Sequence, residues 1–352
     1  MSELRALSDA LVSANLSPAT KTPARSWQKL LAPYAVPCPW RATFETVITG
    51  GLFFGLMAAT IWGLAYDVWW ILALTPLTAA AVVRLFIIQH DCGHGSFFPW
   101  AWANHWLGRC IGVVTLTPYA YWRRSHATHH ATSGNLDRRG AGDIDTLTVR
   151  EYRALSGWQR LKYRCYRHPI VLLGVGPIYQ YMVAYRLPFS GNMRDVRNWL
   201  STQGTNAAIA AVFVALCLTI GPGPFLLAYL PAALVAGSLG IWLFYVQHQF
   251  EQAYWQPEQN WDFHEAAVQG SSFYDLPRLL HWVTGNIGFH HIHHLSSRIP
   301  CYNLPKCHDE VPELRPAKRL GMVESIFCYR LMLWDEDRGR LVSLKQARAA
   351  LA

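Results

Sequence analysis

The chain has 352 residues, of which 52% are hydrophobic and only 15% are charged, and its formal net charge is +9. This balance, with sixteen Trp and sixteen Tyr, excludes an ordinary water-soluble enzyme and is typical of a membrane protein. We attribute the positive charge first to membrane topology and to attraction for anionic lipid head groups. Nucleic-acid binding is disfavoured, because no recognition motif accompanies the charge.

The first part of the chain, residues 1–45, is polar and interrupted by prolines, and it lacks the continuous apolar core of a signal peptide. We expect a cytoplasmic N-terminal segment. The eight cysteines contain no CxxC pair and nearly all would lie in the membrane or in a reducing cytosol. No disulfide framework is therefore expected.

An apolar tract follows, in which Asp67 is the only charged residue between positions 46 and 83. One bilayer crossing needs about 20 apolar helical residues, so the tract predicts a helical hairpin with crossings at about 46–66 and 68–89. Arg84 falls inside the second crossing. We expect its long side chain to extend toward the polar interface.

A second apolar tract, residues 198–250, contains no Lys, Arg, Asp or Glu, and "GPGP" interrupts it at position 221. It predicts a second hairpin with crossings at about 206–220 and 225–247. Neither outer turn carries Lys or Arg, so the positive-inside rule places the remaining polar parts, and both termini, in the cytoplasm.

The polar parts are a cap formed by residues 90–205 and 248–310, and a C-terminal tail, residues 311–352. Within the cap, the apolar segment 111–122 is too short to cross a bilayer and is expected to be interfacial or re-entrant. Residues 170–187 are expected along the membrane surface. The predicted fold is all-α: an integral membrane protein with four transmembrane helices in two hairpins and a helical cytoplasmic cap, whose membrane domain spans residues 46–310.

Three histidine clusters, "HDCGH", "HATHH" and "HHIHH", follow the second crossing, lie in the large loop and follow the fourth crossing. In each cluster the spacing is i, i+4 or i, i+3, i+4, which places imidazoles on one helix face. All three clusters emerge on the cytoplasmic side. The residues that share these faces are His90, His94, His126, His129, His130, His290, His293 and His294.

Eight imidazoles are more ligands than one metal takes, so the clusters predict a site for two metals. Imidazole suits Fe, Zn, Cu and Ni, and ligand softness does not choose among them. His248, at the end of the fourth crossing, is a candidate ninth ligand, and His291 is expected to pack against or support the site. The remaining histidines lack the spacing and are expected to be solvated or locally bonded: His105, His168, His264, His281 and His308.

The three boxes, their order and the flanking stretches "HDCGHGSFF", "HATHHATSGNLDRRGAGDI", "WLFYVQHQFE" and "TGNIGFHHIHHLSSRIPCYNL" resemble the integral-membrane fatty acid desaturases, in particular the bacterial acyl-lipid type. The likeness covers residues 82–310, and "LWDED" at 333–337 is a weaker similarity. It implies two non-haem irons, O₂ as co-substrate, and dehydrogenation of an acyl CH₂–CH₂ to a cis double bond at a bacterial inner membrane. The implied ligands are the eight box histidines and His248.

One position departs from the family. Where the family has a water-binding asparagine one turn before the His248 position, this chain has Phe244, so the open coordination site is expected to be arranged differently. Hydrogen-bond acceptors commonly orient metal-binding histidines. The candidates by sequence position, each of which could equally be a helix cap or a solvated charge, are Asp91, Asp143, Asp145, Glu251 and Asn286.

Removing hydrogen from an unactivated methylene requires a redox metal that uses O₂, which zinc cannot supply. The chain has no dinucleotide-binding fingerprint, no Cys₄ cluster spacing and no haem-domain "HPGG". We therefore expect no bound haem, flavin or nicotinamide. Electrons would come from an external donor such as a ferredoxin, docking on the basic face.

The sequence also allows two alternatives. A related diiron hydroxylase or ketolase begins with the same hydrogen abstraction and differs only in its product. A non-catalytic metal transporter or sensor also clusters histidines in a membrane, although it would place them along a pathway through the crossings.

Overall fold

The computed structural model describes residues 24–140, 142–187 and 195–349. The predicted N-terminal segment is therefore described only from residue 24, and residues 188–194 of the predicted cap and the last three residues of the tail lie outside the described part. Within it the chain is mostly helical, as predicted.

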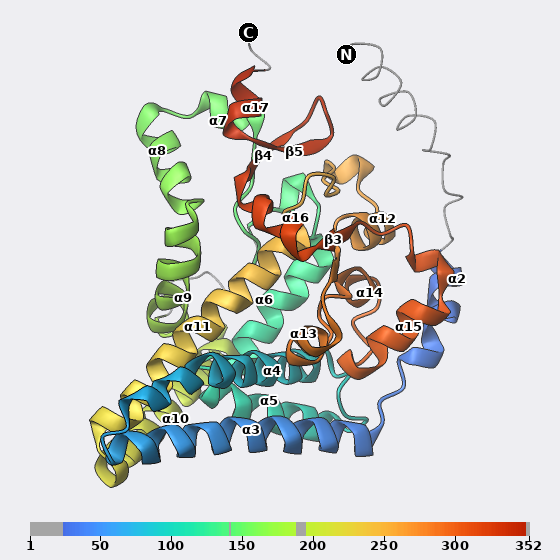
Figure 1. The fold of residues 1–352 in the computed structure, drawn as a ribbon. Helices are drawn as coiled ribbons and strands as arrows, with labels where there is room; N and C mark the ends of the chain where they lie inside the picture. Colours follow the sequence, from blue (N-terminus) through green and yellow to red (C-terminus); the bar gives the residue numbers. More distant parts are fainter. Residues whose placement is uncertain (1–23, 141, 188–194, 350–352) are drawn as a thin grey trace.

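In the described part of the chain four helices are long and apolar enough to cross a membrane, which confirms the number predicted (Figure 1). They are longer than predicted, because the helical conformation continues beyond each apolar core at one or both ends. Their bounds are Pro39–Ala65 (α3), Trp69–His94 (η2, Trp69–Leu74, and α4, Thr75–His94), Val196–Ile220 (α10) and Pro222–His248 (α11).

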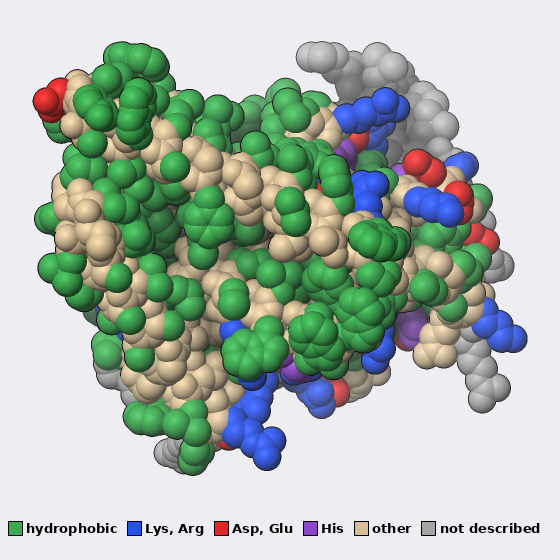
Figure 2. Space-filling view, turned by 90° about the horizontal axis from the view of Figure 1, so that it is seen from below, with side chains coloured by type: hydrophobic (Ala, Val, Ile, Leu, Met, Phe, Trp, Pro, Cys, Tyr) green, Lys and Arg blue, Asp and Glu red, His purple; other side chains and the backbone are tan. Residues whose placement is uncertain are grey.

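The two outer turns form where the sequence predicts breaks. Asp67 has a positive φ of 59° after α3 ends, and Gly221 has a φ of 97° between α10 and α11. Glycine tolerates positive φ without strain, and Pro222 begins α11 at a position where its missing N–H costs nothing. Figure 2 shows a face largely covered by hydrophobic side chains, with Lys and Arg gathered toward its right-hand and lower edges.

The α4 helix is the central element, since it packs against α3, α5 and α11. The predicted re-entrant segment 111–122 is not one element. It contains the end of α5 (Ala101–Val114), a turn in which Leu116 has a positive φ of 55°, and the start of α6 (Tyr119–Thr132). This turn brings α6 beside the end of α4.

A segment made of two π-helical turns and one short α-helix packs along α11. The π-helical turns are η4 (Ile170–Val175) and η5 (Gln180–Ala184), and α9 (Gly176–Tyr179) lies between them. Close packing depends on Gly237 of α11, where a Cβ would lie 2.7 Å from the Tyr181 ring. The outer side of the segment is apolar and exposed.

The cap contains the short strands β1 (Leu147–Thr148), β2 (Phe273–Asp275), β3 (Arg319–Gly321), β4 (Leu331–Asp335) and β5 (Arg340–Ser343). One sheet has the order β1-β4-β5, with β1 parallel and β5 antiparallel to β4, and β2 pairs with β3 in parallel. Because β3, β4 and β5 lie beyond residue 310, the C-terminal residues are built into the cap rather than forming a separate tail.

Short helices complete the cap and the N-terminal part. The α helices are α2 (Ala24–Leu31), α7 (Val149–Ala154), α8 (Gly157–Tyr166), α12 (Phe263–Gln269), α13 (Arg278–Val283), α14 (His290–Leu295), α15 (Leu304–Glu310), α16 (Met322–Phe327) and α17 (Leu344–Ala349). The 3₁₀ turns are η1 (Ala32–Tyr34), η3 (Leu136–Arg138), η7 (Glu258–Asn260), η8 (Cys301–Asn303), η9 (Pro312–Leu314) and η10 (Cys328–Arg330).

Arg84 does not extend to the polar interface, and that prediction was wrong. Its guanidinium is buried, with an exposed fraction of 6%, and pairs with Glu45 of α3, which is 3% exposed. Arg84 Nε also donates to Thr49 Oγ1 at 3.0 Å, and the guanidinium lies 4.0 Å from the Trp282 ring centroid. An acidic partner one helix away satisfies the charge inside the protein, so α3, α4 and α13 are tied together.

We predict that Glu45→Gln destabilises the protein by about 3–5 kcal/mol, because it leaves the Arg84 charge buried without its partner. Thermal unfolding in lipid nanodiscs, followed by tryptophan fluorescence, measures the change. Removing the exposed Asp275–Arg319 pair by Asp275→Asn is the control and is expected to cost no more than about 1 kcal/mol. Equal effects of the two substitutions would contradict a structural role for the buried pair.

Candidate metal centre

The three histidine boxes lie on three helices, and His248 ends a fourth. The last two turns of α4 carry His90 and His94, and Gly95, with a φ of 69°, ends that helix. The second box lies on α6 and the third makes up nearly all of α14. Since α4 contacts α6 and α11, the boxes converge at the end of the membrane helices.

All nine predicted histidines come together, in two groups whose ring nitrogens lie within 4.8 Å of one another. The first group has five members: His90, His94, His126, His130 and His293. The second group has four: His129, His248, His290 and His294. We call them the five-histidine group and the four-histidine group.

The helical spacing explains the division. Residues at i and i+4 differ by about 40° around a helix, whereas i and i+3 differ by about 60° in the opposite sense. On α6 the i, i+4 pair His126 and His130 joins the five-histidine group, and His129 turns to the other group. On α14 the i, i+4 pair His290 and His294 joins the four-histidine group, and His293 turns to the five-histidine group.

The ring nitrogens meet at distances expected for ligands of one metal. His126 Nε2 lies 2.9 Å from His90 Nε2 and 3.1 Å from His130 Nε2. In the four-histidine group, His248 Nε2 lies 2.9 Å from His290 Nε2. Nitrogens bound about 2.1 Å from a metal at right angles are about 3 Å apart, so both groups fit a cation.

The histidines are held in the form that binds metal. Burial, reinforced by the neighbouring imidazoles, lowers the pKa of five cluster histidines outside the membrane helices well below the usual 6.5: His126, His130, His290, His293 and His294. Neutral imidazole has a free lone pair for a metal. His94 Nε2 is buried with no hydrogen-bond partner among the described residues, as expected of a nitrogen that faces a metal.

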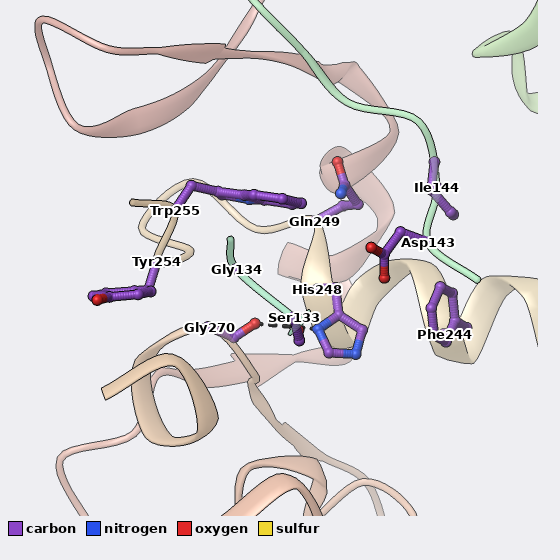
Figure 3. A pocket seen from close by; sticks show the side chains of 10 residues that line it. All are labelled: Ser133, Gly134, Asp143, Ile144, Phe244, His248, Gln249, Tyr254, Trp255 and Gly270. Carbon is purple, nitrogen blue, oxygen red and sulfur yellow. Dashed lines mark hydrogen bonds between the residues drawn. The ribbon is translucent and has the colours of Figure 1, made fainter. Parts of the chain in front are cut away.

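Acceptors at the outer edge of three rings fix their orientation. Asp91 Oδ1 lies 3.1 Å from His90 Nδ1, and Asp143 Oδ1 accepts from His129 Nδ1. The Gly270 carbonyl oxygen lies 3.2 Å from His248 Nδ1 (Figure 3). Because carboxylates and carbonyls only accept, Nδ1 carries the proton and Nε2 presents its lone pair to the group.

The other three predicted acceptors lie elsewhere. The Asp145 side chain is exposed, while Glu251 Oε1 pairs with Arg340 at 2.7 Å. Asn286 Nδ2 donates to the Cys301 carbonyl oxygen at 3.0 Å. Nearness in sequence does not fix where a side chain points, and the Gly270 carbonyl was missed because a backbone acceptor leaves no signal in the sequence.

His291 is fully buried outside both groups, with its ring centroid 5.7 Å from that of His308 and 6.0 Å from that of Phe273. It belongs to the third box in sequence and packs against these two rings. His105 Nδ1 lies 3.2 Å from the Tyr119 hydroxyl. Among the described residues, His105, His168, His264, His281 and His308 do not join a metal-binding group.

Phe244, the position that departs from the family, lies against the four-histidine group. Its ring centroid is 5.0 Å from that of His129 and 5.1 Å from that of His248. Figure 3 shows Phe244 and Asp143 on one side of His248 and Gly270 on the other. A hydrophobic ring therefore borders this group where a polar amide was expected from the family.

A cavity of about 460 Å³ reaches the histidines from the membrane helices; His90, His126 and His290 form part of its wall. It runs along α11, where Tyr229 and Phe244 both line it; these residues, fifteen positions apart, span about 22 Å. Its wall is mainly apolar, with contributions from α4, α6 and the segment 170–185. The arrangement can hold a long, thin, apolar molecule with one part beside the metal groups.

Known proteins resemble this chain over most of its length. The fatty acid desaturase family model matches residues 67–325. A fatty acid desaturase of Bacillus subtilis is 45% identical over 322 residues, which cover 90% of each chain. An sn-1 oleoyl-lipid 12-desaturase of Synechocystis is 29% identical and covers 74% of this chain and 73% of its own length.

A further relative, an sn-1 acyl-lipid omega-3 desaturase (ferredoxin) of Nostoc, is 27% identical over 76% of this chain and 73% of its own. The family model covers well over half of the chain and the Bacillus relative nearly all of it. The chain therefore belongs to the fatty acid desaturase family.

Proposed function

We propose that this membrane desaturase acts on the acyl chains of membrane lipids, with two irons bound by the nine histidines. The reaction is R–CH₂–CH₂–R′ + O₂ + 2e⁻ + 2H⁺ → R–CH=CH–R′ + 2H₂O. The observation that carries the proposal is the apolar cavity that ends at both histidine groups. We place the protein in the bacterial inner membrane with this site on the cytoplasmic side, on the basis of the charge distribution.

Two irons would supply the chemistry that the side chains lack, namely reductive activation of O₂ strong enough to break unactivated C–H bonds. The five- and four-histidine groups would each hold one of them. The neutral nitrogen donors fit iron, although they do not exclude other first-row metals. The redox requirement of the reaction is what selects iron over zinc.

The chain itself positions the substrate and keeps water out. Small residues of α11, among them Ala233, Gly237 and Gly240, leave room along the cavity for an extended chain. The Trp122 ring stacks on His126, with centroids 4.6 Å apart, and borders the cavity as well. One methylene pair would thus be held beside the metals while the rest of the chain lies in an apolar environment.

The position of the groups argues against a metal transporter. Such a protein needs ligands distributed along a pathway through the crossings, whereas these histidines gather at one end of α4 and α11 and in the cap. A hydroxylase or ketolase is distinguished by its product. Mass spectrometry of lipids from a host that lacks desaturases, expressing this chain, is expected to show new double bonds without added oxygen.

We propose that the electrons come from a separate carrier of the ferredoxin type. The described residues contain no Cys₄ cluster, and one relative is named as a ferredoxin-dependent desaturase. The net charge of +9 favours an acidic carrier.

We predict that Asp143→Ala lowers the affinity for metal about 10–100-fold, because His129 loses the acceptor that orients its ring. Iron content of the purified protein by mass spectrometry, together with lipid product, measures the effect. Asp145→Ala, which removes an exposed carboxylate two residues away, should retain both the iron content and the lipid product.

His129→Ala should abolish the product, and full activity in that variant would remove the second box from the metal site.

We predict that Gly240→Leu shortens the usable cavity and shifts the products toward shorter acyl chains. A Cβ at Gly240 meets nothing within 4 Å, so the larger side chain can extend into the cavity without a clash. Gly55→Leu on α3, also without neighbours within 4 Å, is the matched control. An unchanged chain-length profile in Gly240→Leu would show that the substrate lies elsewhere.

We predict that turnover with an acidic ferredoxin falls steeply with salt, because screening over a Debye length of about 10 Å at 0.1 M weakens docking of opposite charges. Initial rates over a range of salt concentrations measure this. The same series with a small uncharged reductant is the control and should stay flat. Salt-independent turnover with ferredoxin would argue against docking on a basic face.

A further inference from the structure

The α8 helix is exposed over nearly its whole length. It begins with a capping box, in which Ser156 and Gln159 satisfy each other's backbone N–H groups. Of its ten residues only Tyr163 is buried. A helix that is so little covered by its own protein, yet carries an exposed Trp158, is expected to have a partner that the chain does not supply.

The exposed side of α8 carries an apolar stripe with a basic residue on each flank. Trp158 is 63% exposed and Leu161 is 40% exposed, and with the exposed Cys165 they form an i, i+3, i+7 stripe. On a helical projection Lys162 and Arg164 lie on opposite flanks of this stripe. The helix contains no Asp or Glu.

The helix is anchored to the end of a membrane helix. Arg167, directly after α8, is buried and donates to the Tyr245 hydroxyl at 3.0 Å and to Gln249 Oε1 at 3.0 Å, at the end of α11. The chain then enters the segment 170–184, which packs on α11. Figure 1 shows α8 and α9 as one column beside α11.

The apolar surface continues from α8 into this segment. Ile170 is 73% exposed and Ile178 is 50% exposed. Leu172 and Tyr181 of the same segment face inward and line the cavity. The column formed by α8 and the segment 170–184 therefore has an apolar outer surface and an inner surface that borders the cavity. Basic residues flank its outer surface at the α8 end.

We propose that α8 lies at the bilayer surface and binds anionic lipid head groups. The stripe formed by Trp158, Leu161 and Cys165 would enter the boundary between head groups and acyl chains, while Lys162 and Arg164 reach lipid phosphates on either side. Basic residues flanking an apolar stripe are typical of helices at the membrane interface.

A bilayer fits α8 better than the other occupants. A second copy would need opposite charge to meet Lys162 and Arg164, and α8 offers no acidic residue. An acidic carrier protein would match the charges but not require the apolar surface that continues through Ile170. The direct attachment to α11, through Arg167, holds α8 close to the membrane helices.

A spin label on Cys165 tests the proposal in the full chain. The more accessible other cysteines, Cys38, Cys110 and Cys217, are replaced by Ser, and the protein is placed in nanodiscs of phosphatidylcholine with phosphatidylglycerol. We expect the label to be more accessible to O₂ than to a water-soluble nickel complex. The control label at Lys345→Cys, on the exposed side of α17, should show the reverse.

The charge contribution is tested by Lys162→Gln with Arg164→Gln. In the anionic nanodiscs the ratio of lipid-facing to water-facing label is expected to fall about fivefold per charge removed, and in pure phosphatidylcholine it should change little. Trp158→Ser should lower the ratio in both lipids. These side chains are exposed, so the variants are expected to fold.

Three results would overturn the proposal. A Cys165 label as accessible to the nickel complex as the Lys345→Cys label would place α8 in water. Protection of the label only after addition of an acidic electron carrier would assign α8 to protein docking. Dipolar broadening between labels of two chains would assign it to a dimer contact.

Discussion

Nine imidazoles must each point a nitrogen into one of two groups, and the rest of the structure depends on meeting this constraint. Asp91, Asp143 and the Gly270 carbonyl fix which nitrogen of His90, His129 and His248 faces inward. Such a site requires α4, α6, α11 and α14 to approach at fixed rotations. The buried Arg84–Glu45 pair contributes to this rigidity by tying α3 to α4.

The same arrangement joins the metal site to the lipid phase. The cavity runs along α11 from the histidines toward the middle of the membrane helix, so an acyl chain can reach the site while it stays in apolar surroundings. The segment 170–184 closes one side of this cavity and continues the exposed surface of α8. In our account, one column both contacts the bilayer and lines the substrate path.

The sequence predicted the parts that periodicity and composition control. Long uncharged tracts predicted the four crossings, i, i+3, i+4 spacing predicted eight of the nine histidines that meet, and the place of His248 at the end of the fourth crossing made it the candidate ninth. It did not predict that His129 and His293 cross to the other group, since that depends on how α6 and α14 are rotated against each other. Nor could it predict the Gly270 carbonyl, the Glu45 partner of Arg84, or the exposed positions of Asp145 and Glu251. These depend on where side chains and backbone groups point in the folded protein.

The most direct test of the central claim is iron X-ray absorption combined with metal quantification on the purified protein. The account predicts two irons per chain, each surrounded by a shell of four to five imidazole nitrogens. One iron per chain, zinc in place of iron, or a shell dominated by oxygen would contradict it.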